Sequence, residues 1–161
     1  MIRTYGVDPG NSSALASVTL DSRIPRCVGL VQVYGVNWIK RMDAALSNAR
    51  GPVYCEVMQP KIRASAHARN HAVAFSLGRK VGMVEALCFR YGLDFHPLTT
   101  AQWWAALPTM LGPKRADPSH RIGECCDMVR DAAAWLDEVP EGRKPDCAEA
   151  ILIAAAGALR G

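Results

Sequence analysis

The chain has 161 residues, of which 50% are hydrophobic and 21% are charged. This length predicts one domain over residues 1–161, and the apolar content suffices for a sizeable core, which excludes a chain disordered throughout. The formal net charge is an ordinary +4, and the longest apolar run, residues 150–159, is too short to cross a membrane, which excludes a membrane-spanning protein.

The first third of the chain predicts three strands, a helix and a fourth strand. Short apolar segments at residues 2–7, 14–20 and 27–33 are typical of strands, and their spacing predicts an antiparallel meander. Apolar residues at helical spacing predict a helix within residues 36–49. The segment Val53–Val57 is apolar throughout except for one acid, which predicts a buried strand.

The rest of the chain predicts four helices and a fifth strand. A one-face apolar pattern indicates a long helix over residues 65–91, and a strand follows at residues 93–98. We expect further helices from about Thr100, over residues 122–136 and over residues 146–159. This order of elements predicts an α/β fold in which helices cover both faces of one mixed sheet.

The charge is unevenly distributed along the chain. Residues 1–116 carry 14 basic and 6 acidic side chains, whereas residues 117–161 carry 5 basic and 9 acidic ones. The stretch between Glu56 and Glu85 contains no acid, and its basic residues are Lys61, Arg63, Arg69, Arg79 and Lys80. Such a stretch either faces a polyanion or forms a solvated helix face.

Two strand ends place an acid where solvation alone does not explain it. Asp8 ends the first strand in Asp-Pro-Gly, which is a good turn sequence in its own right, so this acid has either a turn role or a functional one. Glu56 lies in the most apolar strand, where a carboxylate must be paired, protonated or metal-bound unless the side chain reaches water at an edge.

Asp146 and Glu149 open the last helix, three residues apart and on one face. A capping box with Asp146 as the N-cap explains both residues without chemistry. The combination with the strand ends favours another interpretation: neighbouring first and fourth strands bring Asp8 and Glu56 together, and the helix adds its two acids. Four such carboxylates repel one another unless cations neutralise them, and two divalent ions about 4 Å apart are the usual device for cleaving phosphodiesters.

Four motifs occur in order along nearly the whole chain. They are Asp8-Pro9-Gly10 after the first strand, Glu56 closing PVYCE, SLGRKVGMVEAL in the long helix, and DCAEAILIAAAG in the last helix. With these motifs the chain resembles the RuvC-type Holliday-junction resolvases, above all their short phage and bacterial branch. The resemblance implies an RNase H-like fold with a mixed five-stranded sheet flanked by helices on both faces. It also implies a homodimer that resolves four-way DNA junctions by paired symmetric nicks.

The resemblance further implies a Mg²⁺-dependent (or Mn²⁺-dependent) endodeoxyribonuclease with two ions in each site. By position, the residues expected to be catalytic and metal-binding are Asp8, Glu56, Asp146 and Glu149. Glu149 stands where many relatives have aspartate. The family also carries a lysine before the penultimate helix, a role that falls here to Lys114, Arg115 or Arg121. Together with Lys61, Arg63 and Arg69 beside the Glu56 strand, these are the expected contacts to DNA.

Three alternatives remain open from the sequence. The first is another RNase H-like nuclease acting on branched DNA or structured RNA, and the second is a non-catalytic junction-binding protein. The third, a nucleotide-binding fragment of the actin-like ATPases, lacks the length for two lobes. We expect no membrane partner and no small-molecule cofactor.

The six cysteines form no CxxC pair and no zinc-type spacing with histidine, so we expect reduced, mostly buried thiols. Because no signal segment is recognised, we expect a cytoplasmic location, in a bacterium or, for a phage-encoded protein, in its host. Trp103-Trp104 could stack on unpaired bases, but one core and one interface residue is the favoured interpretation. Gly78 and Gly82 allow close helix approach at a dimer interface.

Overall fold

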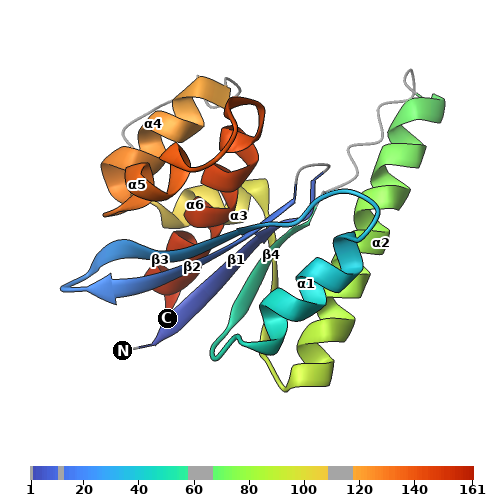
Figure 1. The fold of residues 1–161 in the computed structure, drawn as a ribbon, viewed down its shortest axis with the longest axis horizontal. Coiled ribbons are helices and arrows are strands. Elements are labelled where there is room, and N and C mark those ends of the chain that lie inside the picture. Colours follow the sequence, from blue (N-terminus) through green and yellow to red (C-terminus); the bar gives the residue numbers. More distant parts are fainter. Residues whose placement is uncertain (1, 11–12, 58–66, 109–117) are drawn as a thin grey trace.

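A computed structural model describes residues 2–10, 13–57, 67–108 and 118–161 (Figure 1). It contains a five-stranded sheet in the order β3-β2-β1-β4-β5. The strands are β1 (Arg3–Asp8), β2 (Ala14–Asp21), β3 (Ile24–Gln32), β4 (Val53–Val57) and β5 (Phe95–Thr99). The first three strands are antiparallel neighbours, whereas β4 pairs in parallel with both β1 and β5. The predicted meander and mixed five-stranded sheet are confirmed.

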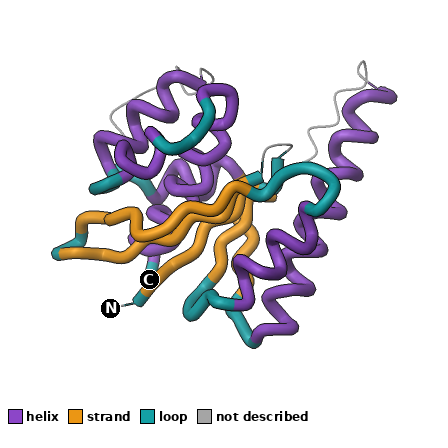
Figure 2. The backbone as a smooth tube through the Cα atoms, in the orientation of Figure 1, coloured by secondary structure: helices purple, strands orange, loops and turns teal. Residues whose placement is uncertain are grey.

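Helices cover both faces of this sheet, as predicted (Figure 2). They are α1 (Trp38–Ser47), α2 (His67–Tyr91), α3 (Thr100–Ala106), α4 (Pro118–Met128), α5 (Ala132–Asp137) and α6 (Lys144–Arg160), with a 3₁₀ turn at Glu141–Arg143. One core lies between the sheet and α1 and α2, and the other lies under α3 to α6. Within the described residues, no helix is both long and apolar enough to cross a membrane.

The alternation of side chains along the strands decides which residues face α6. Val7 and Cys55 are fully buried in the core under α1 and α2. Successive side chains of a strand point to opposite faces, so Gly6 and Asp8 on β1, and Glu56 on β4, are directed toward α6. The same pleat that builds the core therefore presents two acids to the opposite face.

Two glycines allow α6 to lie directly on the sheet. A Cβ atom on Gly6 would lie 2.2 Å from the carbonyl oxygen of Ala150, and one on Gly157 would lie 2.3 Å from the ring of Tyr54. No side chain fits at either point. Most of α6 is buried and its residues are largely small, so helix and sheet backbones approach closely along β1.

One predicted helix is wrong: residues 122–136 form two helices rather than one. The chain leaves α4 after Met128, and Arg130 pairs with β3 by donating its N–H to the Pro25 carbonyl and accepting from Cys27 N–H, each at 2.9 Å. Asp131 then takes a left-handed conformation with φ of 64° before α5 begins. Hydrogen bonding to the edge strand thus overrides the helical periodicity.

We expect Gly6→Ala to destabilise the fold, because the added methyl group collides with helix backbone that cannot move without leaving the sheet. Overpacking of this kind costs about 1–3 kcal/mol or more, which corresponds to a decrease in melting temperature of roughly 3–10 °C for a chain of this size. Thermal unfolding followed by circular dichroism measures the change.

Gly123→Ala is the matched control, because among the described residues no atom outside its own stretch of helix lies within 4 Å of the added Cβ, in the exposed part of α4. Alanine is the better helix former, so this variant should be as stable as the parent or up to about 1 kcal/mol more stable. Equal melting temperatures for Gly6→Ala and the parent would contradict the packing.

Candidate metal centre

Asp8 occupies the end of β1, where the chain turns. Its carboxylate Oδ1 accepts a hydrogen bond from the Gly10 N–H at 2.9 Å, as the turn interpretation requires. The side chain is nevertheless only 5% exposed and faces a cavity. Turn formation and burial beside other acids therefore coexist in this residue.

Glu56 lies one residue beyond the parallel pair Val7–Cys55, next to Asp8 at the same sheet edge. Its Oε1 atom accepts hydrogen bonds from the Thr100 hydroxyl at 2.5 Å and from the Trp103 indole N–H at 3.2 Å. In the described part of the chain no donor bonds Oε2, so that atom is available to a metal ion.

The acids of the last helix do not form the capping box. Helix α6 begins at Lys144 with Arg143 as its N-cap and a proline in its first turn, so Asp146 lies inside the helix rather than at its cap. Because the 3₁₀ turn before it continues into the helix, the start lies two residues earlier than predicted. Glu149 lies almost one turn further on and is 9% exposed.

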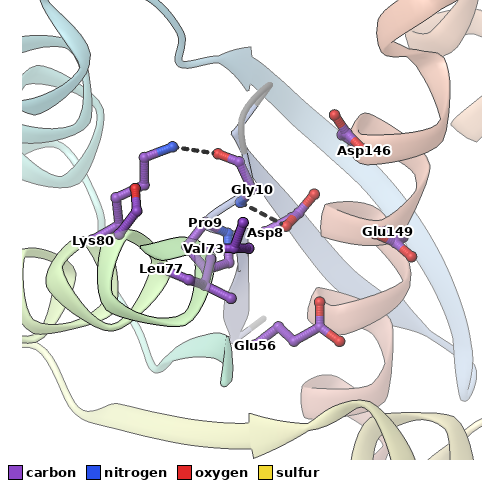
Figure 3. Close-up of a pocket in the computed structure, with 10 residues that line it drawn as sticks. Asp8, Pro9, Gly10, Glu56, Val73, Leu77, Lys80, Asp146 and Glu149 are labelled. Atoms are coloured by element: carbon purple, nitrogen blue, oxygen red, sulfur yellow. Dashed lines mark hydrogen bonds between the residues drawn. The ribbon is translucent and has the colours of Figure 1, made fainter. Parts of the chain in front are cut away.

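Asp8, Glu56 and Glu149 come together from three elements. Each offers a carboxylate oxygen, and these oxygens all lie within 4.8 Å of one another. Asp146 joins them in lining a cavity of about 510 Å³ (Figure 3). Among the described residues that line the cavity the metal-binding donors are hard carboxylate oxygen atoms, with no histidine or cysteine, and this set suits Mg²⁺ or Mn²⁺ better than zinc. The cluster could therefore hold a metal ion.

Burial and mutual repulsion shift the acids toward their protonated forms. Burial raises the pKa of Asp8 to about 7, against the opposing hydrogen bond from Gly10, and Asp146 and Glu56 raise it further. Burial, followed by the charge of Asp8, raises the pKa of Glu149 to about 8. Without a cation, the folded chain thus retains protons on acids that are ordinarily ionised at neutral pH.

Arg121 supplies part of the missing positive charge. Its guanidinium Nη1 forms an ion pair with Glu149 Oε1 and lowers the pKa of both Glu149 and Asp8. On the opposite side of Asp8, Lys80 donates from Nζ to the Gly10 carbonyl at 2.5 Å (Figure 3). The acids are therefore flanked by one cation from α4 and one from α2.

Only some of the residues expected to contact DNA lie in the described part of the chain. Lys61, Arg63, Lys114 and Arg115 lie outside the described residues. Arg69 lies in α2, but its side chain is also outside them. Arg121, also expected at DNA, is directed to Glu149.

The sequence did not reveal that Thr100, Trp103 and Lys80 position the acids: the first two bond Glu56, and the third holds the turn at Asp8. Thr99 caps α3 through a capping box with Gln102, and this leaves the Thr100 hydroxyl for Glu56. Trp103 and Trp104 are both buried and stacked with ring centroids 4.6 Å apart, so both belong to the core. The parallel pairing of β4 with β5 is the signal that places the start of α3 beside Glu56. For Lys80, the basic stretch of the sequence gives no sign of its bond to the Gly10 carbonyl.

A five-stranded mixed sheet with helices on both faces, whose acids meet where β1 and β4 end, is the RNase H-like fold. The chain is similar to Thermus thermophilus RuvC in complex with a Holliday junction substrate, with a TM-score of 0.67 and 17% identity over 99% of this chain and 94% of that chain. It is also similar to the yeast mitochondrial Holliday junction resolvase Ydc2, with a TM-score of 0.62 and 14% identity over 99% and 78% of the two chains.

A third similar structure is the fowlpox virus resolvase with substrate Holliday junction DNA, with a TM-score of 0.58 and 12% identity over 100% of both chains. No family model and no curated protein sequence matches the chain. The likeness confirms the predicted RNase H-like fold, with coverage that extends over the whole chain.

We expect the metal-free chain to lose stability as the pH rises from about 4 to about 8. In this range the unfolded chain has already released protons that Asp8 and Glu149 still hold when folded, so the free energy of unfolding falls with pH. In EDTA, the melting temperature at about pH 8.5 should lie roughly 5–10 °C below that at about pH 5.5.

Asp8→Asn should raise the melting temperature in EDTA at the higher pH, because it removes one buried charge. The control is Asp94→Asn, since the Asp94 side chain is exposed, and this variant should keep the parent's pH profile. An Asp8→Asn protein with the same pH profile as the parent would contradict the electrostatic account.

Proposed function

We propose that the chain is a metal-dependent endonuclease that resolves four-way DNA junctions by paired nicks. The observation that carries this proposal is the convergence of carboxylate oxygens from β1, β4 and α6 within 4.8 Å of one another. The cavity that they line is large enough to admit a phosphodiester group together with metal ions. Two of the structures with a similar fold are complexes with junction DNA, which supports a branched DNA substrate.

The residues that would hold the metal are Asp8, Glu56 and Glu149, with Asp146 at the same cavity. When bound, divalent ions supply positive charge that activates a water and stabilises the leaving 3′ oxygen, and two of them per site is the number we propose. In the reaction, the water oxygen forms a bond to phosphorus while the bond from phosphorus to the 3′ oxygen breaks. A hydrolysis of this kind needs no small-molecule cofactor.

The chain's own residues fix the ligands before substrate arrives. Thr100 and Trp103 both bond Glu56 Oε1 and so orient the other oxygen of that carboxylate toward the cavity. The Gly10 N–H holds Asp8, and Lys80 in turn holds the Gly10 carbonyl. Ligands held in this way lose less conformational entropy when metal and substrate bind.

The thiols near the acids do not compete for the metal. Burial and the neighbouring acids raise the pKa of Cys147 to about 12, and burial raises that of Cys55 well above its ordinary value. Both side chains therefore stay neutral at physiological pH, whereas a thiol binds metal as the thiolate. Among the described side chains near the acids, this supports the carboxylates rather than the thiols as ligands.

The decisive experiment incubates the protein with a synthetic four-way junction and Mg²⁺. We expect paired symmetric nicks. Substituting a residue that only supports a metal ligand typically lowers activity roughly 10- to 100-fold, and we expect Asp8→Asn to lower the cleavage rate by more than that. Asp94→Asn, an exposed acid, should cut like the parent. Duplex DNA and structured RNA of equal length should be cut much more slowly.

An intact junction after incubation with the parent protein would overturn the proposal, as would equal cutting by Asp8→Asn. Tight junction binding without cleavage would instead favour a non-catalytic binding protein. Preferential cutting of structured RNA would favour a different nuclease of the same fold.

The exposed face of α2 supports the proposal of a homodimer. Phe75 is 76% exposed and Phe89 is 89% exposed, and they lie 14 residues apart, which places them on one side of the helix. Gly78 and Gly82 lie between them, and in the described part of the chain no atom beyond the helix's own nearby backbone lies within 4 Å of a Cβ built on either. A second copy of α2 could approach closely at the glycines while the aromatic rings pack at both ends.

Phe89→Glu should therefore weaken or abolish the dimer by burying a charge in the interface. Sedimentation velocity over a range of concentrations measures the monomer fraction. Ile24→Glu is the control, because Ile24 is also exposed but lies at the β2–β3 hairpin, far from α2 (Figure 1). A parent that sediments as a monomer, or a dimer insensitive to Phe89→Glu, would contradict this surface.

A further inference from the structure

Tyr34, Arg41 and Arg143 form a basic cluster that belongs to none of the residue sets assigned above. Tyr34 follows β3, Arg41 lies on α1, and Arg143 is the N-cap residue of α6. The guanidinium carbon of Arg143 lies 3.5 Å from the centroid of the Tyr34 ring, and that of Arg41 lies 4.8 Å from it. Three segments far apart in the sequence thus meet on one aromatic ring, which we call the Tyr34 cluster.

The Tyr34 cluster lies at the same edge of the sheet as the acids. The end of β3 pairs with the start of β2 through Gln32 and Ala14, and Ala14 in turn pairs with Asp8. The loop from β3 to α1 leaves the sheet at that edge (Figure 1). Arg143 precedes Asp146 by three residues, a rise of about 4.5 Å along a helix axis. A polyanion bound at the acids therefore reaches this cluster within a short distance.

The positive charge of the cluster is not neutralised by the described part of the protein. There, no carboxylate lies within 4.0 Å of Arg41 or Arg143, and the nearby Glu141 is paired with Lys144. By contrast, Arg26 and Arg130, beside the other end of β3, are paired with Asp131 and Asp21. Two like charges that share one ring repel each other, and an anion placed between them removes that repulsion.

The groups present match a phosphate in particular. Guanidinium groups offer planar pairs of N–H donors that fit phosphate oxygens, and the Tyr34 hydroxyl adds a further polar group. The ring itself holds both side chains by cation–π contact, so less conformational entropy is lost when they bind. The two arginines also lower the pKa of the Tyr34 hydroxyl, first through hydrogen bonds from their side chains and then through their charge.

We propose that Tyr34, Arg41 and Arg143 bind a backbone phosphate of the nucleic-acid substrate, close along the strand to the phosphate that is cut. This inference rests on the proposed function and adds to it a surface on the β3 side of the acids. The surface positions the strand and does not take part in the bond changes. Because it contacts the backbone, it binds all sequences alike.

The test measures junction binding over a range of salt concentrations, with all proteins in an Asp8→Asn background to prevent cutting. Arg41→Gln and Arg143→Gln should each weaken binding about tenfold at low salt. Each should also reduce the slope of log K against log salt by up to about 0.9. The loss should be equal for junctions of different sequence. Arg143→Lys keeps the charge and should retain the slope while losing part of the affinity.

Arg26→Gln is the matched control, because its guanidinium is already paired with Asp131 at the other end of β3. It should leave the slope and the affinity unchanged. Melting temperatures of all variants report whether the cluster merely holds the β3–α1 loop. An Arg143→Gln protein that is less stable than the parent but has the same salt slope overturns the inference.

The outcomes separate this inference from the function on which it rests. If the Asp8→Asn parent binds the junction and the Tyr34 cluster variants bind with the same slope, the phosphate site is wrong while the function stands. If the parent itself fails to bind any junction, the proposed function fails and the phosphate site fails with it. A loss confined to one junction sequence would assign the cluster to base recognition and overturn a backbone site.

Discussion

The close approach of α6 to β1 at Gly6 is the constraint on which the site depends. At that point the carbonyl of Ala150 lies where a side chain would begin, so the helix can lie on the sheet only because residue 6 has none. The contact sets the height of the helix above the sheet and its position along β1. Asp8 lies two residues beyond Gly6, and Glu149 directly precedes Ala150. The same contact therefore brings their carboxylates together.

Placing these acids together is electrostatically costly, and the chain offsets the cost only in part. Without a metal, retained protons on the acids and the positive charge of Arg121 beside Glu149 both reduce the repulsion. If divalent cations supplied the charge, as we propose, the protons would leave and the Arg121 guanidinium would become available to other anions. A fold that stabilises such a cluster incompletely is suited to gaining stability from metal binding.

Much of the fold follows from local patterns. Alternating and continuous apolar segments predicted all five strands, and β4 lies at Val53–Val57 as expected. The long helix and the last helix also follow from periodicity. The single helix expected at residues 122–136 does not form. Instead, the Arg130 backbone makes hydrogen bonds to β3, with residues more than 100 positions away in the sequence. Periodicity reports which residues are apolar, but it carries no information about such a distant partner.

The sequence by itself determined which residue types end the strands and open the last helix, and so it named the four acids. Tertiary structure alone decided that Asp8, Glu56 and Glu149 lie within 4.8 Å of one another, and that Asp146 is not a cap. It also decided that Arg121 pairs with Glu149 and that Arg41 and Arg143 meet on Tyr34. The physical reason is that the pleat and the apolar pattern are local, whereas the distances between charges depend on how helices pack across the sheet.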